Sequence, residues 1–199
     1  MSQSPFGVLL TQPQTQAGAD APWLIRQTAI THIPSVGAWL AVKQVAKAGK
    51  APEALLAWGD PVFRVDQLAP LAARKGDFAM RQVVLTKLED VLSLKLNADW
   101  VVLSACNTAA ADVKEDEALS GLARGFFYAG SRSLLVTHWA VESDSARLLT
   151  TATFEHYTQH PEAAKAESLR QAMLKLMANP AYAHPAYWAP FALVGDGGR

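Results

Sequence analysis

The spacing of apolar residues changes repeatedly along this chain, and the changes predict alternating helices and strands. Residues 35–46 carry apolar side chains every three or four positions, which predicts an amphipathic helix with Ser35 as its N-cap. Residues 54–58 (ALLAW) and 100–105 (WVVLSA) are short continuous apolar runs, a pattern typical of strands buried on both faces. Between these runs, residues 86–96 regain helical spacing after a stretch without a clear period.

The second half of the chain alternates in the same way. Residues 119–127 repeat apolar side chains at helical spacing, and Gly130 follows them as a predicted helix stop. Ser143 or Asp144 is placed to cap a later helix. In order, the predicted elements are a helix at 119–127, a strand at 133–137, a helix from 143 to about 158, a helix opening at Pro161 and a strand at 191–194. Helices that alternate with strands predict an α/β fold with a mostly parallel central sheet.

No repeat and no change of composition divides the chain into separate domains. Its 199 residues, half of them apolar, suffice for one domain with a hydrophobic core. Residues 1–20 are rich in Gln, Thr, Ser, Ala and Gly without periodicity, so we expect a disordered leader there. Residues 21–199 are expected to form the single domain.

The balance of charge and the cysteine count narrow the functional class. The chain has 18 basic and 18 acidic residues with no block of like charge, which argues against binding to nucleic acid or to a membrane. It shows no secretory signal pattern and no long apolar run, so we expect a cytoplasmic protein. The one cysteine, Cys106, cannot form an internal disulfide and is either packed or reactive. None of the five histidines shows the spacing of a metal site, so we expect no metal and no cofactor.

Cys106 directly follows the predicted strand at 100–105, at the sheet edge where α/β proteins gather catalytic groups. From about residue 22 to residue 196 the sequence resembles the CHAT domain family, which is a branch of the caspase-like cysteine peptidases. The segments that carry the resemblance are 33–35 (IPS), 58–63 (WGDPVF), 101–108 (VVLSACNT), 119–133 (LSGLARGFFYAGSRS), 136–141 (VTHWAV) and 186–195 (AYWAPFALVG). The resemblance implies a caspase-like three-layer α/β/α sandwich with Cys106 as the catalytic nucleophile.

The chain departs from that family at the partner of the cysteine. The family places a strand that ends in a histidine block, of the type His-Phe-Ala-Thr-His-Gly, between the Gly-Asp-Pro segment and the cysteine strand. Residues 61–106 of this chain contain no histidine. We interpret the difference as an internal deletion near residues 74–81, which removes one interior strand and leaves a truncated, incomplete CHAT domain.

Loss of that histidine predicts a pseudoenzyme. A free cysteine thiol has a pKa of about 8.5, so it is only slightly ionised at neutral pH unless a neighbouring base takes its proton. The rate cost of a missing acid–base group is on the order of 10² to 10⁴. His138, which follows the next predicted strand, is a weak candidate for a replacement base. An active cysteine endopeptidase that pairs Cys106 with His138 therefore remains the alternative.

Three further residues are candidates for substrate binding. The resemblance implies that Asn107 and Trp139 line a peptide-binding cleft and that Glu117 lies near it, where the carboxylate could select a basic residue at the cleavage site. Glu117 equally fits the role of an acidic residue at the positive end of the following helix. The expected partner is a peptide or protein, either cleaved as a substrate or only held by a non-enzymatic interaction module. Family members accompany helical repeats in bacterial signalling and defence, so a helical-repeat protein is a further expected partner.

Removal of an interior strand raises a question about the fold itself. Each unpaired buried backbone group costs about 1–3 kcal/mol, against a typical net stability of about 5–15 kcal/mol. The two neighbouring strands could pair directly with each other, or residues 70–82 could supply a replacement strand. Alternatively, the open edge of the sheet could pair with a second molecule. A remnant with no settled fold is the remaining alternative, and the oligomeric state is left open.

Overall fold

The computed structural model describes residues 5–13, 20–33, 35–47, 53–59, 79–80, 91, 94, 96–104 and 124–198. The chain divides into two compact units. The first holds Ile33–Val136 and Val194–Asp196, and the second holds Ser2–His32, Thr137–Leu193 and Gly197–Arg199. The polypeptide passes from one unit to the other more than once, so neither unit is one continuous stretch of the sequence. The single domain over 21–199 stays a prediction, and each unit is described by itself below.

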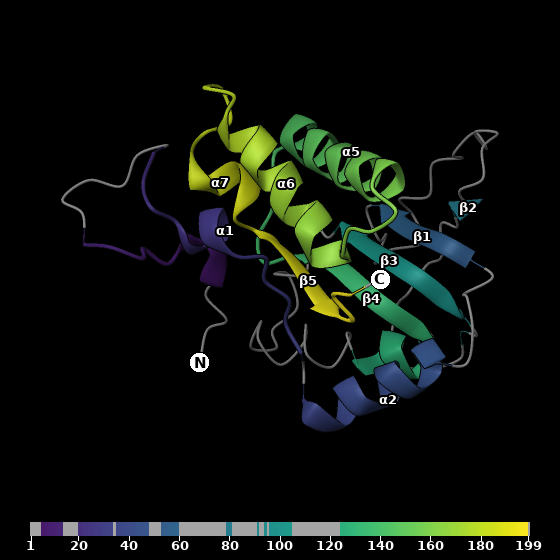
Figure 1. Cartoon of the computed structure of the whole chain (residues 1–199). Coiled ribbons are helices and arrows are strands. Elements are labelled where there is room, and N and C mark those ends of the chain that lie inside the picture. The colour runs from purple at the N-terminus through teal and green to yellow at the C-terminus, as the bar shows by residue number, and fades with distance from the viewer. Residues whose placement is uncertain are drawn as a thin grey trace, which may run out of the picture. The chain divides into compact units, whose positions relative to one another are not determined.

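Five strands form a sheet in the order β2-β1-β3-β4-β5. They are β1 (Glu53–Gly59), β2 (Ala79–Met80), β3 (Ala98–Ser104), β4 (Ser131–Thr137) and β5 (Phe191–Gly195). The pairs β1–β2, β1–β3 and β3–β4 are all parallel, and Figure 1 shows β1, β3 and β4 side by side. The predicted α/β class is therefore confirmed.

β1 pairs directly with β3, the strand that leads toward Cys106. Their register runs from Glu53 opposite Ala98 to Gly59 opposite Ser104, so the two strands end level with each other. The short strand β2 pairs with the other side of β1, where Ala79 lies opposite Leu56. Of the arrangements left open by the sequence, the described strands adopt the one in which two strands pair directly, here β1 with β3. Their backbone groups then satisfy one another.

β4 is buried along its length and β3 is buried from Trp100 to Leu103, as the sequence predicts. Trp100 and Val101 on successive positions of β3 are 1% and 0% exposed, so both faces of that strand are covered. All seven residues of β4 are buried, and this strand begins two positions before the predicted 133. The Ser133 hydroxyl donates a hydrogen bond to the backbone oxygen of Asp196 at 2.6 Å, which satisfies a polar group inside the first unit.

The predicted helices at 35–46 and 119–127 are confirmed where the structure describes them, whereas in the predicted helical stretch 86–96 residue 91 is helical and residues 94 and 96 are not. Helix α2 (Val36–Lys47) buries Val42, and the Lys43 ammonium lies 2.8 Å from the carboxylate of the buried Asp196. Trp39 was predicted on the buried stripe of this helix but is 38% exposed, so the buried face is narrower than the pattern indicates. The helical residues 124–128 end at Gly130, whose φ of 102° is the left-handed conformation expected at a helix stop.

The second unit contains α1 (Leu24–Gln27), α5 (Ser143–Gln159), α6 (Lys165–Met177) and α7 (Pro185–Trp188). Helices α5 and α6 pack against each other along their lengths (Figure 1). The predicted caps of α5 were wrong, because the Glu142 carboxylate accepts hydrogen bonds from the backbone N–H groups of Asp144 and Ser145. Helix α6 starts at Lys165 rather than at Pro161. No helix among the residues described has the length and apolar character needed to cross a membrane.

Residues 5–13 lie in the stretch for which the sequence predicts disorder, yet they form defined contacts. They include the 3₁₀ helix η1 (Phe6–Val8), and the backbone N–H of Leu24 donates to the carbonyl of Leu9 at 2.7 Å. Leu10 and Trp23 form an antiparallel bridge. This segment has few periodic apolar residues of its own, but it packs against α1, a long-range contact that local composition does not encode.

Arg170 connects α6 to the backbone around α1. Its Nε donates to the carbonyl oxygen of Ile25 at 2.8 Å, and another guanidinium nitrogen donates to the carbonyl of Arg26. The same guanidinium forms an ion pair with Glu167 at 2.9 Å. These bonds satisfy carbonyl groups at the end of α1 that a four-residue helix cannot satisfy internally.

Replacement of Arg170 by methionine should lower the free energy of unfolding by about 1.5–3 kcal/mol, the usual worth of hydrogen bonds from a charged donor. Urea denaturation of the whole chain measures this change. The matched control is Lys175→Met on the same helix, which removes only an exposed ion pair with Glu155 at 3.8 Å and should cost less than about 0.5 kcal/mol. Equal losses in the two variants would contradict the role given to Arg170.

Candidate functional site

The residues predicted to carry chemistry fall into two groups in the structure. Cys106, Asn107 and Glu117 lie outside the described residues, and the nucleophile and cleft roles given to them stay predictions. His138 and Trp139 are described, directly after the carboxyl end of β4. The described part of the candidate site is therefore the segment that follows β4.

His138 is fixed through its backbone and lies beside a second histidine. Its N–H donates to the carbonyl oxygen of Pro190 at 2.9 Å. Its half-buried ring lies edge-on to the ring of His32, with 6.2 Å between the ring centroids and 74° between the ring planes. The base predicted from the sequence thus belongs to a pair of imidazoles.

His32 is the site residue that the sequence analysis missed. It was placed only at the start of the first helix, but its N–H donates to the carbonyl oxygen of Leu193 at 2.8 Å. Its ring also lies 5.8 Å from the ring of Phe6, so three aromatic side chains from distant parts of the chain meet here. No local pattern marks this histidine, because its neighbours are brought to it by the fold.

The electrostatics of the pair favour the neutral form of His32. Burial lowers the pKa of His32 below its ordinary value, and the neighbouring His138 lowers it further. A neutral imidazole can accept a proton, so the ring is chemically suited to act as a base.

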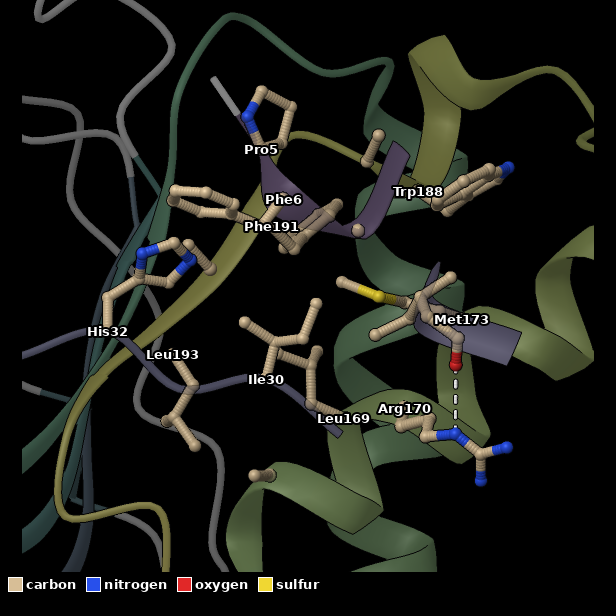
Figure 2. Close-up of a pocket in the computed structure, with 15 residues that line it drawn as sticks. Pro5, Phe6, Ile30, His32, Leu169, Arg170, Met173, Trp188, Phe191 and Leu193 are labelled. Carbon is tan, nitrogen blue, oxygen red and sulfur yellow. Dashed lines mark hydrogen bonds between the residues drawn. The ribbon is translucent and has the colours of Figure 1, made fainter. Parts of the chain in front are cut away.

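A small hollow adjoins His32 in the second unit. Figure 2 shows the His32 and Phe6 rings at one end of it and the Arg170 side chain at the other, with apolar side chains of α6 and β5 between them. Its volume is about 20 Å³, which is enough for about one water molecule. A peptide side chain does not fit in this space, so the hollow is a packing feature and not a substrate cleft.

Trp139 lies beside His138 but has a different environment. It is 40% exposed, and its indole N–H reaches the carbonyl oxygen of Ala186 at 3.4 Å. An indole held at one end and open to solvent on the other can contact a bound peptide. The predicted role in substrate binding is not tested by this geometry.

The fold and the segment after β4 define an α/β protein with a parallel sheet and a histidine at the carboxyl edge of one strand. Residues 72–196 match the model of the CHAT domain, and the chain belongs to this family, which is related to the caspase-like peptidases. The upstream segments 33–35 and 58–63 precede the matched residues.

Two curated relatives are similar to the chain. Tetratricopeptide repeat protein 28 of Mus musculus is 33% identical over 117 residues, which is 59% of this chain and 5% of the relative. The Homo sapiens protein of the same name is 31% identical over 115 residues, or 58% of this chain and 4% of the relative. This chain therefore spans only a small part of these relatives. Both relatives are mammalian, so they give no support to the predicted bacterial setting.

The half-buried position of His32 predicts a pH-dependent stability. Because the folded state holds the pKa of His32 below its ordinary value of about 6.5, the unfolded chain takes up a proton first as the pH falls. The free energy of unfolding should therefore decrease as the pH is lowered from about 6.5 toward the folded pKa. Urea denaturation at pH values between about 7.5 and 5 measures the slope, which should be shallower in His32→Gln.

The matched control for this slope is His184→Asn. His184 is exposed and caps α7 by accepting a hydrogen bond from the N–H of Ala186, a role that asparagine can keep. This variant should retain the wild-type slope. If His32→Gln retains it as well, the buried imidazole is not the source of the pH dependence.

Proposed function

We propose that this chain is a degenerate CHAT-domain protein of the caspase-like cysteine peptidase class that does not hydrolyse peptides, because Cys106 has lost its histidine partner. The observation that carries the proposal is the direct pairing of β1 with β3. Residues 60–97 connect these strands in sequence, and residues 61–106 contain no histidine.

The pairing supports the loss of one interior strand. A strand carrying the family's histidine block would stand between the Gly-Asp-Pro strand and the cysteine strand. In this chain the strand that ends at Gly59 takes that place itself, because Gly59 lies directly opposite Ser104. This pairing supports a sheet that lacks the element that would supply the base.

A truncated caspase-like α/β/α sandwich is the fold that agrees best with these features. Three consecutive parallel pairs place the strand before Cys106 inside the sheet, with β1 on one side and β4 on the other. Helices of substantial length occur in both units, as the alternation of helices and strands requires. The caspase-like arrangement of these layers is part of the proposal.

His138 is the one described histidine for which the sequence suggests rescue of activity. Its backbone is held by Pro190, and its ring already lies against that of His32. The proposal assigns this imidazole to the local histidine pair and gives the thiol of Cys106 no base. Without a base, the acid–base contribution to hydrolysis is lost, on the order of 10² to 10⁴ in rate.

The reactivity of Cys106 tests the proposal. An electrophilic peptide should label the thiol at neutral pH no faster than it labels a free model thiol, because only the thiolate is nucleophilic. Mass spectrometry of the labelled chain gives the rate. His138→Ala should change this rate by less than about twofold, as should the control His184→Asn.

The opposite result has a clear form. Rapid labelling of Cys106 that is abolished in His138→Ala and kept in His184→Asn would establish a working Cys–His pair. The alternative function, an active cysteine endopeptidase, would then replace the pseudoenzyme.

A non-enzymatic interaction module is the role that remains for an inactive domain. We propose that such a domain holds a peptide or protein without cleaving it, with Asn107, Glu117 and Trp139 as the predicted binding residues. The exposed indole of Trp139 supports this role. The curated relatives are named as tetratricopeptide repeat proteins, which favours helical repeats as the partner in this chain's assembly.

A further inference from the structure

Two imidazoles lie against each other at the end of α5. His156 and His160 are four residues apart, so they share one face of the helix. Their ring centroids are 4.4 Å apart and the ring planes are inclined by 32°. His156 is half-buried and His160 is exposed, so solvent reaches the pair.

Ser168 lies beside the ring of His156. The Nδ1 of His156 is 3.1 Å from the hydroxyl oxygen of Ser168, and that hydroxyl is within 3.2 Å of the carbonyl oxygen of Ala164. When the hydroxyl donates its one proton to the carbonyl, the Nδ1 of His156 donates to Ser168 and its Nε2 carries the lone pair.

His160 has a carboxylate beside it. Its Nδ1 lies 3.4 Å from Oε1 of Glu162 as an ion-pair contact. A carboxylate next to Nδ1 favours the tautomer with the proton on that nitrogen, which leaves the lone pair on Nε2. A histidine whose Nδ1–H is held by a carboxylate or hydroxyl is the arrangement that supports a metal-binding Nε2.

The end of a helix also favours a positive ion. His156 lies in the last turn of α5 and His160 is its C-cap, where the unsatisfied carbonyl groups give the helix a partial negative charge. Lys165, at the start of α6, is buried with its ammonium 5.9 Å from the centre of the Tyr157 ring. The exposed carboxylate of Glu162 adds negative charge next to His160.

We propose that His156 and His160 form a binding site for a divalent transition-metal ion such as Zn²⁺, with their Nε2 atoms as ligands and Glu162 and Ser168 as the groups that position them. Imidazole nitrogen is a preferred ligand of Zn²⁺, and two histidines at i and i+4 on one helix face are a known ligand spacing. The expectation that none of the five histidines has metal-site spacing did not take this i, i+4 pair into account.

The site has two protein ligands, and water completes the coordination. No group of three or more His, Cys, Asp and Glu among the described residues is arranged to hold a metal ion. The site therefore leaves coordination positions open to water, and its ion can exchange with solvent. A structural zinc site, in contrast, has four protein ligands. It is independent of Cys106 and of the proposed loss of peptidase activity.

Isothermal titration of the whole chain with ZnCl₂ at pH 7.5 tests the site. The measurement is made in a Cys106→Ser background, which removes the thiol as a competing ligand. One equivalent of Zn²⁺ should bind, and the melting temperature should rise with the Zn²⁺ concentration because the ion binds the folded state. His160→Gln and His156→Gln should each abolish this binding.

Two further variants separate ligands from positioning groups and from other histidines. Glu162→Gln keeps both ligands but weakens the hold on His160, so it should reduce Zn²⁺ affinity by about 10-fold or more without abolishing binding. His184→Asn should bind Zn²⁺ like the wild type. Circular dichroism checks that each variant is folded. If His156→Gln does not fold, the variant at the exposed position, His160→Gln, decides the result.

Three results would overturn the proposal. If the wild-type chain binds no Zn²⁺, there is no site. If binding persists in the double variant His156→Gln/His160→Gln or is lost in His138→Ala, the ion binds at another place. None of these results bears on the labelling rate of Cys106, so the two proposals fail separately.

Discussion

The parallel pairing of β1 with β3 is the constraint on which the sheet depends. A strand inside a sheet has backbone groups on both sides that water cannot reach, and each must find a partner strand. β3 is buried on both faces and has β1 on one side and β4 on the other. The segment that leads to Cys106 therefore keeps a defined place in the sheet, although the family's histidine block is absent from the chain.

The second unit is held by contacts of a different kind. Its helices α5 and α6 pack by apolar faces, but its short elements depend on single polar side chains. Arg170 satisfies carbonyl groups near α1, and Glu142 satisfies N–H groups at the start of α5. The backbone N–H groups of His32 and His138 donate to the carbonyl oxygens of Leu193, within β5, and of Pro190, just before it. The same bonds that organise this unit bring the two histidines together.

Much of the fold could be predicted because periodicity reports burial directly. The strands β3, β4 and β5 and the helix α2 were found within about two residues of their bounds, since each buries a continuous run or a regular stripe. Features that depend on one side chain or on distant contacts were missed. Glutamate is an uncommon N-cap, so Glu142 gave no signal.

The candidate site was predictable only in part, for the same reason. The position of His138 after a strand could be read from the sequence, because the strand pattern is local. The contact of His138 with His32 could not, since it depends on chain segments far apart in sequence. The tautomers of His156 and His160 likewise depend on Ser168 and Glu162, whose roles appear only once α5 and α6 are packed.

The division of the chain between two units has a consequence for its synthesis. The first unit takes its last piece from residues 194–196, where Asp196 bonds to Arg132 and Lys43. The ribosome must deliver that piece before the unit is complete, although nearly all the rest of the unit emerges much earlier. Until then the nascent polypeptide carries an unfinished sheet with exposed apolar strands, and this is the interval in which a chaperone would be needed.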